Sequence, residues 1–179
     1  MNERSSTRIA IDMDEVIADS LEKHLRLYNA EFGASLKVED TRGKKLHDVV
    51  AEDHREGLEA LLWSDDFFGD LKVVEGSQDV VSELVRRYEV FVTTAAMEYP
   101  NSFADKFRWL EWHFPFIPAT NVVFCGDKSI IDADYLIDDN ARHFERFRGE
   151  GILFTAPHNV EEDCYRRVED WQDVRKMFL

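Results

Sequence analysis

The fold of this chain is constrained most by short apolar runs that end at acidic or hydroxyl residues and are separated by helical patterns. The first run spans residues 8–12 and ends at Asp12. Strand patterns return at residues 89–94, 121–124, 135–137 and 151–155, and helical patterns at 76–88, 103–113 and 168–178. Apolar strands that alternate with helices of about 10 to 15 residues predict a parallel sheet with helices on both faces. We therefore expect an α/β fold with a Rossmann-like, doubly wound parallel sheet.

Residues 34–75 interrupt this alternation. They are rich in charge and contain a helical stretch at residues 52–63. The 179 residues suit one domain that carries a small insertion better than two full domains. The sequence thus predicts a core formed by residues 1–17 and 76–179, with a small helical cap at residues 18–75 inserted after the first strand.

The charge balance limits the partners of the chain. Its 37 acidic and 22 basic residues give a formal net charge of −15, which opposes binding to a nucleic acid polymer. A small anion can still bind where a metal and a few placed cations reverse the local field. No stretch approaches the roughly 20 apolar residues of a membrane span, the first residues lack an apolar signal region, and Cys125 and Cys164 form no metal-binding pattern. We expect a soluble cytoplasmic protein with no membrane partner.

Chemically active side chains gather at the predicted strand ends. Ligands of open parallel sheets bind at the carboxyl ends of the strands. At or just beyond those ends the sequence places four acids, a hydroxyl and a lysine: Asp12, Asp14, Thr94, Lys128, Asp138 and Asp139. Carboxylates packed that closely repel each other, so the cluster predicts a cation, and oxygen ligands without His or Cys favour Mg²⁺.

These residue types suit phosphoryl transfer. Asp12 can attack phosphorus and form an aspartyl phosphate. Asp14, two residues further on, can protonate the leaving oxygen and later deprotonate a water molecule. A metal together with Lys128 would neutralise the charge of the transferred phosphoryl group. Thr94 would add a hydroxyl contact, with Thr93 as its nearest rival.

The same residues resemble the four motifs of the haloacid dehalogenase superfamily, in order: the segment 12–16, Thr94, Lys128 and the acidic pair 138–139. Longer stretches are similar to the 5′(3′)-deoxyribonucleotidase family, namely residues 11–19, 67–76, 107–111, 127–139 and 152–159. This resemblance implies a haloacid dehalogenase fold and a Mg²⁺-dependent phosphatase. Its expected substrate is a small phosphomonoester, a (deoxy)ribonucleoside monophosphate, which is hydrolysed through an aspartyl-phosphate intermediate.

The resemblance also assigns roles. It implies that Asp12 is the nucleophile, that Asp14 is the acid/base and offers its backbone carbonyl to the metal, and that Thr94 and Lys128 bind phosphate. The implied metal set is Asp12, Asp14, Asp138 and Asp139. Within the final pair Asp139 is favoured as the direct ligand and Asp138 as its neighbour, a choice that the sequence leaves open.

The chain departs from the family pattern near the substrate. Glu15 stands where the human-type motif has Gly, and Ala95 stands where it has Ser. In this family the cap covers the substrate, and aromatic cap residues stack on the base. Here Ser20, Lys44 and Lys45 replace some of these aromatic residues, whereas Phe68 and Trp63 are retained. We expect four of these cap residues to contact substrate: Trp63, Phe68, Lys44 and Lys45.

Two alternatives remain at this point. The same catalytic set would serve a phosphatase for another small phosphomonoester. A non-enzymatic phosphoacceptor switch, similar to receiver domains, also combines acids, Thr and Lys on a doubly wound sheet. The order of the motifs favours the enzyme, because Lys128 precedes the final acidic pair and no lone acid ends the strand at residues 90–94. The preference for a 5′ or 3′ phosphate and the formation of a homodimer stay open.

Overall fold

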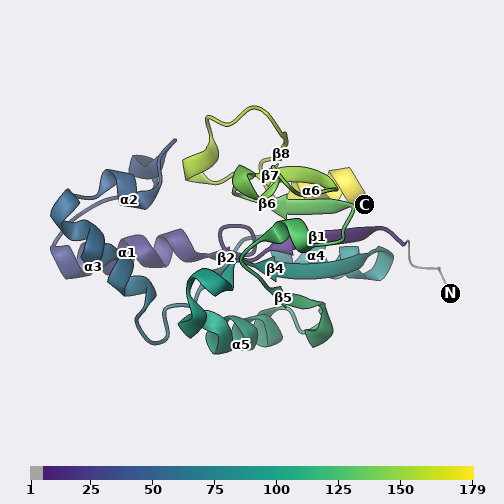
Figure 1. Ribbon diagram of the computed structural model, residues 1–179, viewed down its shortest axis with the longest axis horizontal. Coiled ribbons are helices and arrows are strands. Elements are labelled where there is room, and N and C mark those ends of the chain that lie inside the picture. Colours follow the sequence, from purple (N-terminus) through teal and green to yellow (C-terminus); the bar gives the residue numbers. More distant parts are fainter. Residues whose placement is uncertain (1–5) are drawn as a thin grey trace.

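A parallel six-stranded sheet forms the centre of the protein (Figure 1). The computed structural model describes residues 6–179, so the first residues of the predicted core segment 1–17 lie outside the described part. In spatial order the strands are β5 (Val122–Phe124), β4 (Glu89–Thr94), β1 (Arg8–Asp12), β6 (Tyr135–Asp138), β7 (Glu150–Phe154) and β8 (Arg166–Val168). All neighbouring strands pair in parallel. The α/β, doubly wound prediction is confirmed.

The central strand β1 shows why the sequence folds in this way. Because side chains alternate across a strand, Ile9 and Ile11 enter one core while Ala10 enters the other. All three are fully buried. A strand that is apolar on both faces suits only the interior of a sheet that is covered on both sides.

The two faces of the sheet are covered differently. Helices α4 (Ser77–Arg87), α5 (Phe103–His113) and α6 (Trp171–Phe178) contribute buried side chains to the larger core. The opposite face is covered by the connection between β6 and β7, where Phe144 and Phe147 pack in the second core.

The predicted strands agree with the structure to within one residue at each end, but the last helix starts later than predicted. The helical pattern at residues 168–178 begins at Trp171, because Asp170 accepts hydrogen bonds from the backbone of Gln172 and Asp173 as the N-cap. Residues just before it form β8, which pairs with β7. That strand is only three residues long and carries two arginines, so its sequence lacks the apolar run that would predict a strand.

The helices α1 (Ser20–Phe32), α2 (Leu46–Val49) and α3 (Arg55–Leu62) lie together at one end of the molecule, on the left of Figure 1. Their apolar faces share a separate cluster of buried residues: Leu25, Tyr28, Leu46, Val50 and Leu58. Two short antiparallel strands, β2 (Ala18–Asp19) and β3 (Lys72–Val73), join this helical group to the sheet. We call residues 18–75 the cap; these boundaries stay a prediction.

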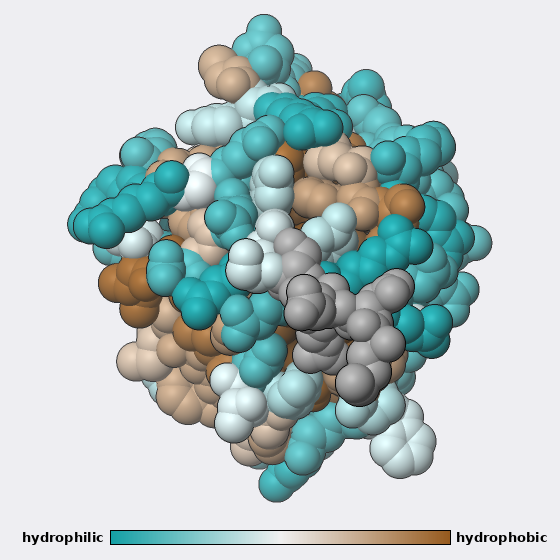
Figure 2. Space-filling model, turned by 90° about the vertical axis from the view of Figure 1, so that its right-hand side faces the viewer, coloured by the Kyte–Doolittle hydropathy of each residue, from teal (hydrophilic) through white to brown (hydrophobic). Residues whose placement is uncertain are grey.

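The surface at the other end, where the strands begin, mixes hydrophilic residues with smaller hydrophobic areas (Figure 2). Such mixing is ordinary for a folded protein. Among residues 6–179, no helix combines the length and the apolar character that crossing a membrane would require.

Two tryptophans three residues apart on α5 offer a matched test of the fold. Trp109 is buried, and its indole N–H donates a 2.8 Å hydrogen bond to the carbonyl of Leu71, at the return from the cap. Trp112 is 82% exposed. We expect Trp109→Phe to lower the free energy of unfolding by about 1–3 kcal/mol, because a buried polar partner is lost. Trp112→Phe should change it by less than about 0.5 kcal/mol. Urea unfolding of both variants measures this, and equal effects would contradict the packing described.

Candidate active site

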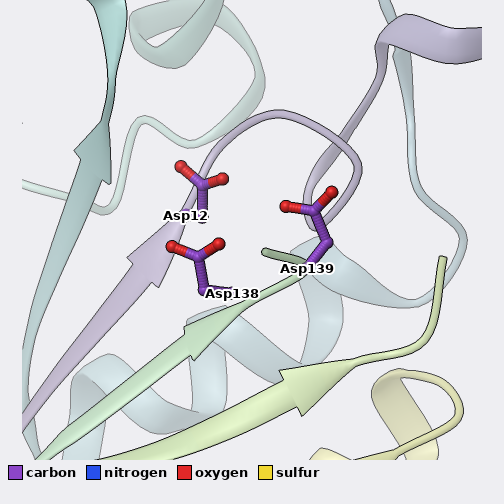
Figure 3. A group of neighbouring side chains, drawn as sticks. All are labelled: Asp12, Asp138 and Asp139. Atoms are coloured by element: carbon purple, nitrogen blue, oxygen red, sulfur yellow. The ribbon is translucent and has the colours of Figure 1, made fainter. Parts of the chain in front are cut away.

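Three neighbouring strands position residues of the predicted site at their carboxyl ends. Asp12, Thr94 and Asp138 are the last residues of β1, β4 and β6, and β1 lies between the other two strands. The chain order of the strands reverses at β1, which is where open parallel sheets bind ligands. Figure 3 shows the carboxylates of Asp12, Asp138 and Asp139 gathered at this edge. The strand-end cluster predicted from the sequence therefore exists.

A buried lysine lies between two of these carboxylates. Lys128 Nζ is 2.6 Å from Asp12 Oδ1 and donates a 2.6 Å hydrogen bond to Asp138 Oδ2. All three side chains are buried. Burial lowers the pKa of Lys128, but the two carboxylates outweigh it and hold that pKa above its usual value. Burial raises the pKa of Asp12 to about 6, and Lys128 opposes the rise. The lysine thus reduces the charge repulsion at the strand ends.

In the described part of the chain, the two carboxylates of the final acidic pair differ in their contacts: Asp138 is hydrogen-bonded through both oxygens, and Asp139 is not. Asp138 accepts from Lys128 through one oxygen and from the backbone N–H of Asn140, at 2.9 Å, through the other. Among residues 6–179, the side chain of Asp139 has a single ion-pair contact, with His158, whose Nε2 lies 3.6 Å from its Oδ2. Burial and the neighbouring acids, first Asp138 and then Asp12, raise the pKa of Asp139 well above its usual value. This difference favours Asp139 as the direct ligand of a cation.

The donor set fits a divalent cation. Oxygens of Asp12, Asp138 and Asp139 lie within 4.8 Å of one another. Asp12 Oδ1 is a buried oxygen whose contact with Lys128 lacks hydrogen-bond geometry. When Asp14 and the three clustered acids are all ionised, the two neighbouring lysines, Lys106 and Lys128, leave two negative charges, which a divalent cation would balance. Oxygen ligands of this kind are those that Mg²⁺ prefers.

A second buried lysine, Lys106 on α5, was missed by sequence reasoning. Its Nζ lies 2.5 Å from Asp14 Oδ2 and donates a 3.0 Å hydrogen bond to Thr94 Oγ1. It also stands over the ring of Phe68, 4.5 Å from the centroid. The available signal was position, because Lys106 shares the buried helix face with Leu110. Thr93, the rival of Thr94, has a buried hydroxyl that finds no partner among residues 6–179.

The departure at Glu15 has a local explanation. Its φ of 60° is left-handed, a conformation that Gly adopts freely and that costs other residues energy. Its Oε1 accepts hydrogen bonds from Ser20 Oγ and from the backbone N–H of Leu21, each 2.7 Å long. These bonds join the turn after Asp14 to the first turn of α1, so the glutamate connects that turn to the cap.

A cavity of about 290 Å³ lies between the cap and the strand ends. One part of its lining is apolar and aromatic: Leu62, Phe67, Phe68 and Tyr99. Another part is basic: Lys44, Lys45 and His158. Burial lowers the pKa of His158, and the charge of Lys45 lowers it further. The cavity therefore has one aromatic and one basic wall, and Asp14 also lines it.

Three of the four predicted cap residues, Phe68, Lys44 and Lys45, line this cavity. Trp63 does not; it is 49% exposed, and its ring lies edge-on to Tyr99 at 5.6 Å. Tyr99, which sequence reasoning also missed, donates a 2.8 Å hydrogen bond to Glu59 of the cap. The substrate contacts of these residues stay a prediction.

The sheet topology and the strand-end acids are those of the haloacid dehalogenase fold. A haloacid dehalogenase-like hydrolase from Streptococcus pneumoniae aligns with a TM-score of 0.65 at 13% identity, covering 97% of this chain and 99% of that chain. A haloacid dehalogenase-type hydrolase from Bacillus subtilis, whose structure contains magnesium, aligns with a TM-score of 0.58 at 14% identity, covering 98% and 99%. At these identities the likeness establishes the fold.

Sequence comparison narrows the class. The model of the family described as 5′ nucleotidase, deoxy (Pyrimidine), cytosolic type C protein matches residues 5–179. A candidate 5′(3′)-deoxyribonucleotidase of Staphylococcus aureus is 46% identical over 171 residues, 96% of this chain and 94% of that protein. The 5′(3′)-deoxyribonucleotidase of Bacillus subtilis is 41% identical over 171 residues, 96% and 98% of the two chains.

The chain belongs to the 5′(3′)-deoxyribonucleotidase family, as its motifs predicted. It is a phosphoric monoester hydrolase of the nucleotidase type. This membership decides against the non-enzymatic phosphoacceptor switch.

The carboxylate cluster predicts a response to metal. We expect Mg²⁺ to stabilise the wild-type chain, by about 2.7 kcal/mol at a concentration 100 times Kd. Asp139→Asn removes one negative charge from the cluster, so this variant should be at least as stable as wild type without metal and should gain little from Mg²⁺. Thermal unfolding in EDTA and in Mg²⁺ measures both effects.

Two further variants control this experiment. Asp132→Asn neutralises a side chain that is 97% exposed and should keep the full Mg²⁺ response. Asp138→Asn should instead destabilise the metal-free chain, because Lys128 loses a buried partner. A wild-type Mg²⁺ response in Asp139→Asn would show that Asp139 is not the ligand.

Proposed function

We propose that this protein hydrolyses (deoxy)ribonucleoside monophosphates with Mg²⁺, through a phosphoryl group carried on Asp12. The observation that supports this most is the different environment of each acid at the strand ends: Asp12 lies beside Lys128, Asp14 lies beside Lys106, and Asp139 has no lysine or arginine ion pair among residues 6–179. Carboxylates in different environments can take different chemical roles at one pH. Family membership supports the nucleotide as substrate.

In the first step an oxygen of Asp12 attacks phosphorus, and the bond from phosphorus to the nucleoside oxygen breaks. Lys128 holds Asp12 through the Oδ1 contact and keeps it in position at the end of β1. Thr94 and Lys128 would contact the phosphoryl oxygens. When bound, Mg²⁺ would supply positive charge to those oxygens, with Asp12, Asp139 and the carbonyl of Asp14 as its protein ligands.

Asp14 handles the proton in both steps. Its Oδ2 is held by Lys106, with Thr94 Oγ1 also nearby at 3.4 Å, whereas Oδ1 has no hydrogen-bond partner within residues 6–179. Protonated Oδ1 would give its proton to the leaving nucleoside oxygen. In the second step Asp14 takes a proton from water, which attacks phosphorus, and the bond to Asp12 breaks to release phosphate. Lys106 acts as a positioning residue for Asp14.

The aromatic wall supports a nucleoside as the leaving group. Phe68 and Tyr99 line the cavity, with their ring centroids 6.2 Å apart. Aromatic side chains at such a wall can stack on a base. A phosphatase for another phosphomonoester would share every catalytic residue and differ here, so activity on a panel of phosphomonoesters separates the two functions.

The covalent step predicts the behaviour of Asp12→Asn. An amide is not a nucleophile, so turnover should fall by several orders of magnitude. Rapid acid quench of the wild-type enzyme with labelled substrate should leave phosphate on the peptide that contains Asp12. Asp132→Asn serves as the control and should retain activity. Wild-type turnover in Asp12→Asn would rule out covalent catalysis at this residue.

The position of Lys106 predicts a leaving-group effect. With a nucleoside monophosphate, Lys106→Met should lower kcat by about 100-fold, because Asp14 loses the contact that orients it for proton transfer. With p-nitrophenyl phosphate the loss should be much smaller, since p-nitrophenolate leaves without protonation. Equal losses on both substrates would assign Lys106 to phosphate binding instead.

Lys23→Met is a matched control for Lys106→Met. Lys23 is also a buried lysine, it pairs with Asp70, and it stands 5.3 Å from the centroid of Phe67. It does not line the cavity. This variant should lose stability without a difference between the two substrates.

A further inference from the structure

We propose that Lys44 and Lys45 form an anion-binding wall that holds a phosphate group of the substrate on the β6 side of Asp12. This inference rests on the proposed phosphatase function and adds a cap-borne binding site to it. In the sequence, these lysines are expected at positions where aromatic residues of the family stack on the base. Here they are instead assigned to a phosphate group.

Contacts between the cap and the core place the two lysines. The backbone N–H of Gly43 donates a 2.9 Å hydrogen bond to the carbonyl of Pro157. Gly43 has a φ of 69°, in the left-handed region that favours glycine, so the backbone can adopt this turn beside Pro157. Lys45 follows two residues later, within about 7 Å of chain reach. The lysine segment therefore lies against the loop that carries His158.

The loop that carries His158 lies on the β6 side of Asp12. His158 lies 3.6 Å from Asp139, which follows β6. The aromatic wall is on the other side, where Lys106 connects Phe68 to Thr94 at the end of β4. Because β1 and Asp12 stand between β4 and β6, the basic and aromatic walls face the catalytic carboxylate from opposite sides.

The ammonium groups of Lys44 and Lys45 make no direct contact with an acid among residues 6–179. Both side chains are exposed, and neither has an ion-pair or hydrogen-bond partner in the described part of the chain. Five other lysines do pair with carboxylates: Lys23, Lys72, Lys106, Lys128 and Lys176. In a chain with 37 acidic and 22 basic residues, two unpaired ammonium groups lining one cavity suit an anion supplied by a ligand.

The ligand chemistry is a phosphate group, which has two sources in a nucleotide. It is either the phosphate being hydrolysed, beside Asp12, or a second phosphate on the sugar of a nucleoside bisphosphate. Both sources require the same ammonium donors. They differ in which substrates depend on the lysines, and this difference separates them experimentally.

The test compares the Lys44→Met/Lys45→Met double variant with wild type and with Lys37→Met. Lys37 is another exposed cap lysine without an ion-pair partner, and it does not line the cavity. We would measure kcat/KM for p-nitrophenyl phosphate, thymidine 5′-monophosphate and thymidine 3′,5′-bisphosphate, together with inhibition by inorganic phosphate. Loss of a charge-assisted hydrogen bond predicts a decrease on the order of tenfold or more.

Two results support the proposal. If the lysines bind the scissile phosphate, all three substrates lose activity together and inorganic phosphate inhibits more weakly. If they bind a second phosphate, only the bisphosphate loses activity. In either case Lys44→Arg/Lys45→Arg should restore much of the loss, and Lys37→Met should match wild type.

Two other results overturn the proposal. A loss shared by both nucleotides, with p-nitrophenyl phosphate and inorganic phosphate unaffected, would place the lysines on the nucleoside. Unchanged kinetics would leave them as solvated surface residues. Calorimetry in an Asp12→Asn background, with inorganic phosphate, thymidine 5′-monophosphate and the bisphosphate, repeats the comparison without turnover. Failure of the proposed function, seen as absent hydrolysis by wild type, is thus distinguished from failure of this inference.

Discussion

The site depends on one buried ammonium group. Lys128 comes from the connection after β5 and contacts acids at the ends of β1 and β6, so it ties together segments that meet only in the folded sheet. Charges buried in this way are costly unless they are paired, and removing one partner of such a group typically costs about 3–5 kcal/mol. The arrangement fixes the carboxylate of Asp12 and occupies that of Asp138. Among residues 6–179, Asp139 then remains the acid of this cluster that makes no ion pair with a lysine, which favours it as the ligand of a cation.

The acids at this edge are distinguished by their partners rather than by their residue type. Asp12 and Asp14 are two residues apart, yet one contacts Lys128 and the other Lys106. The second lysine reaches the site from α5, across the end of β4, and also meets the hydroxyl of Thr94. The proposed division into nucleophile and acid/base therefore follows from which helix or loop supplies the neighbouring cation.

The strand ends were predictable because a parallel sheet aligns the carboxyl ends of its strands, whatever the loops between them do. Alternation along β4 even separates Thr94, near Asp14, from Thr93, whose hydroxyl finds no partner in the described residues. Lys106 was not predictable in this way, because a lysine on a helix is usually solvated and only the packing of α5 buries this one. The strands β2 and β3, with two residues each, are too short to carry a pattern.

The cap follows a different physical logic, which explains why its residues were harder to assign. Its contacts with the core include specific single hydrogen bonds, such as the backbone bond from Gly43 to Pro157 and the side-chain bond from Tyr99 to Glu59. These contacts decide which cap residues turn toward the cavity, and no periodicity in the sequence encodes them. The proposed chemistry depends on the strand ends and the two lysines that contact their acids, Lys106 and Lys128, whereas substrate choice depends on how the cap meets the core. Changes at cavity-lining cap residues such as Lys44 and Lys45 can therefore alter what the cavity recognises while leaving the arrangement around Asp12 intact.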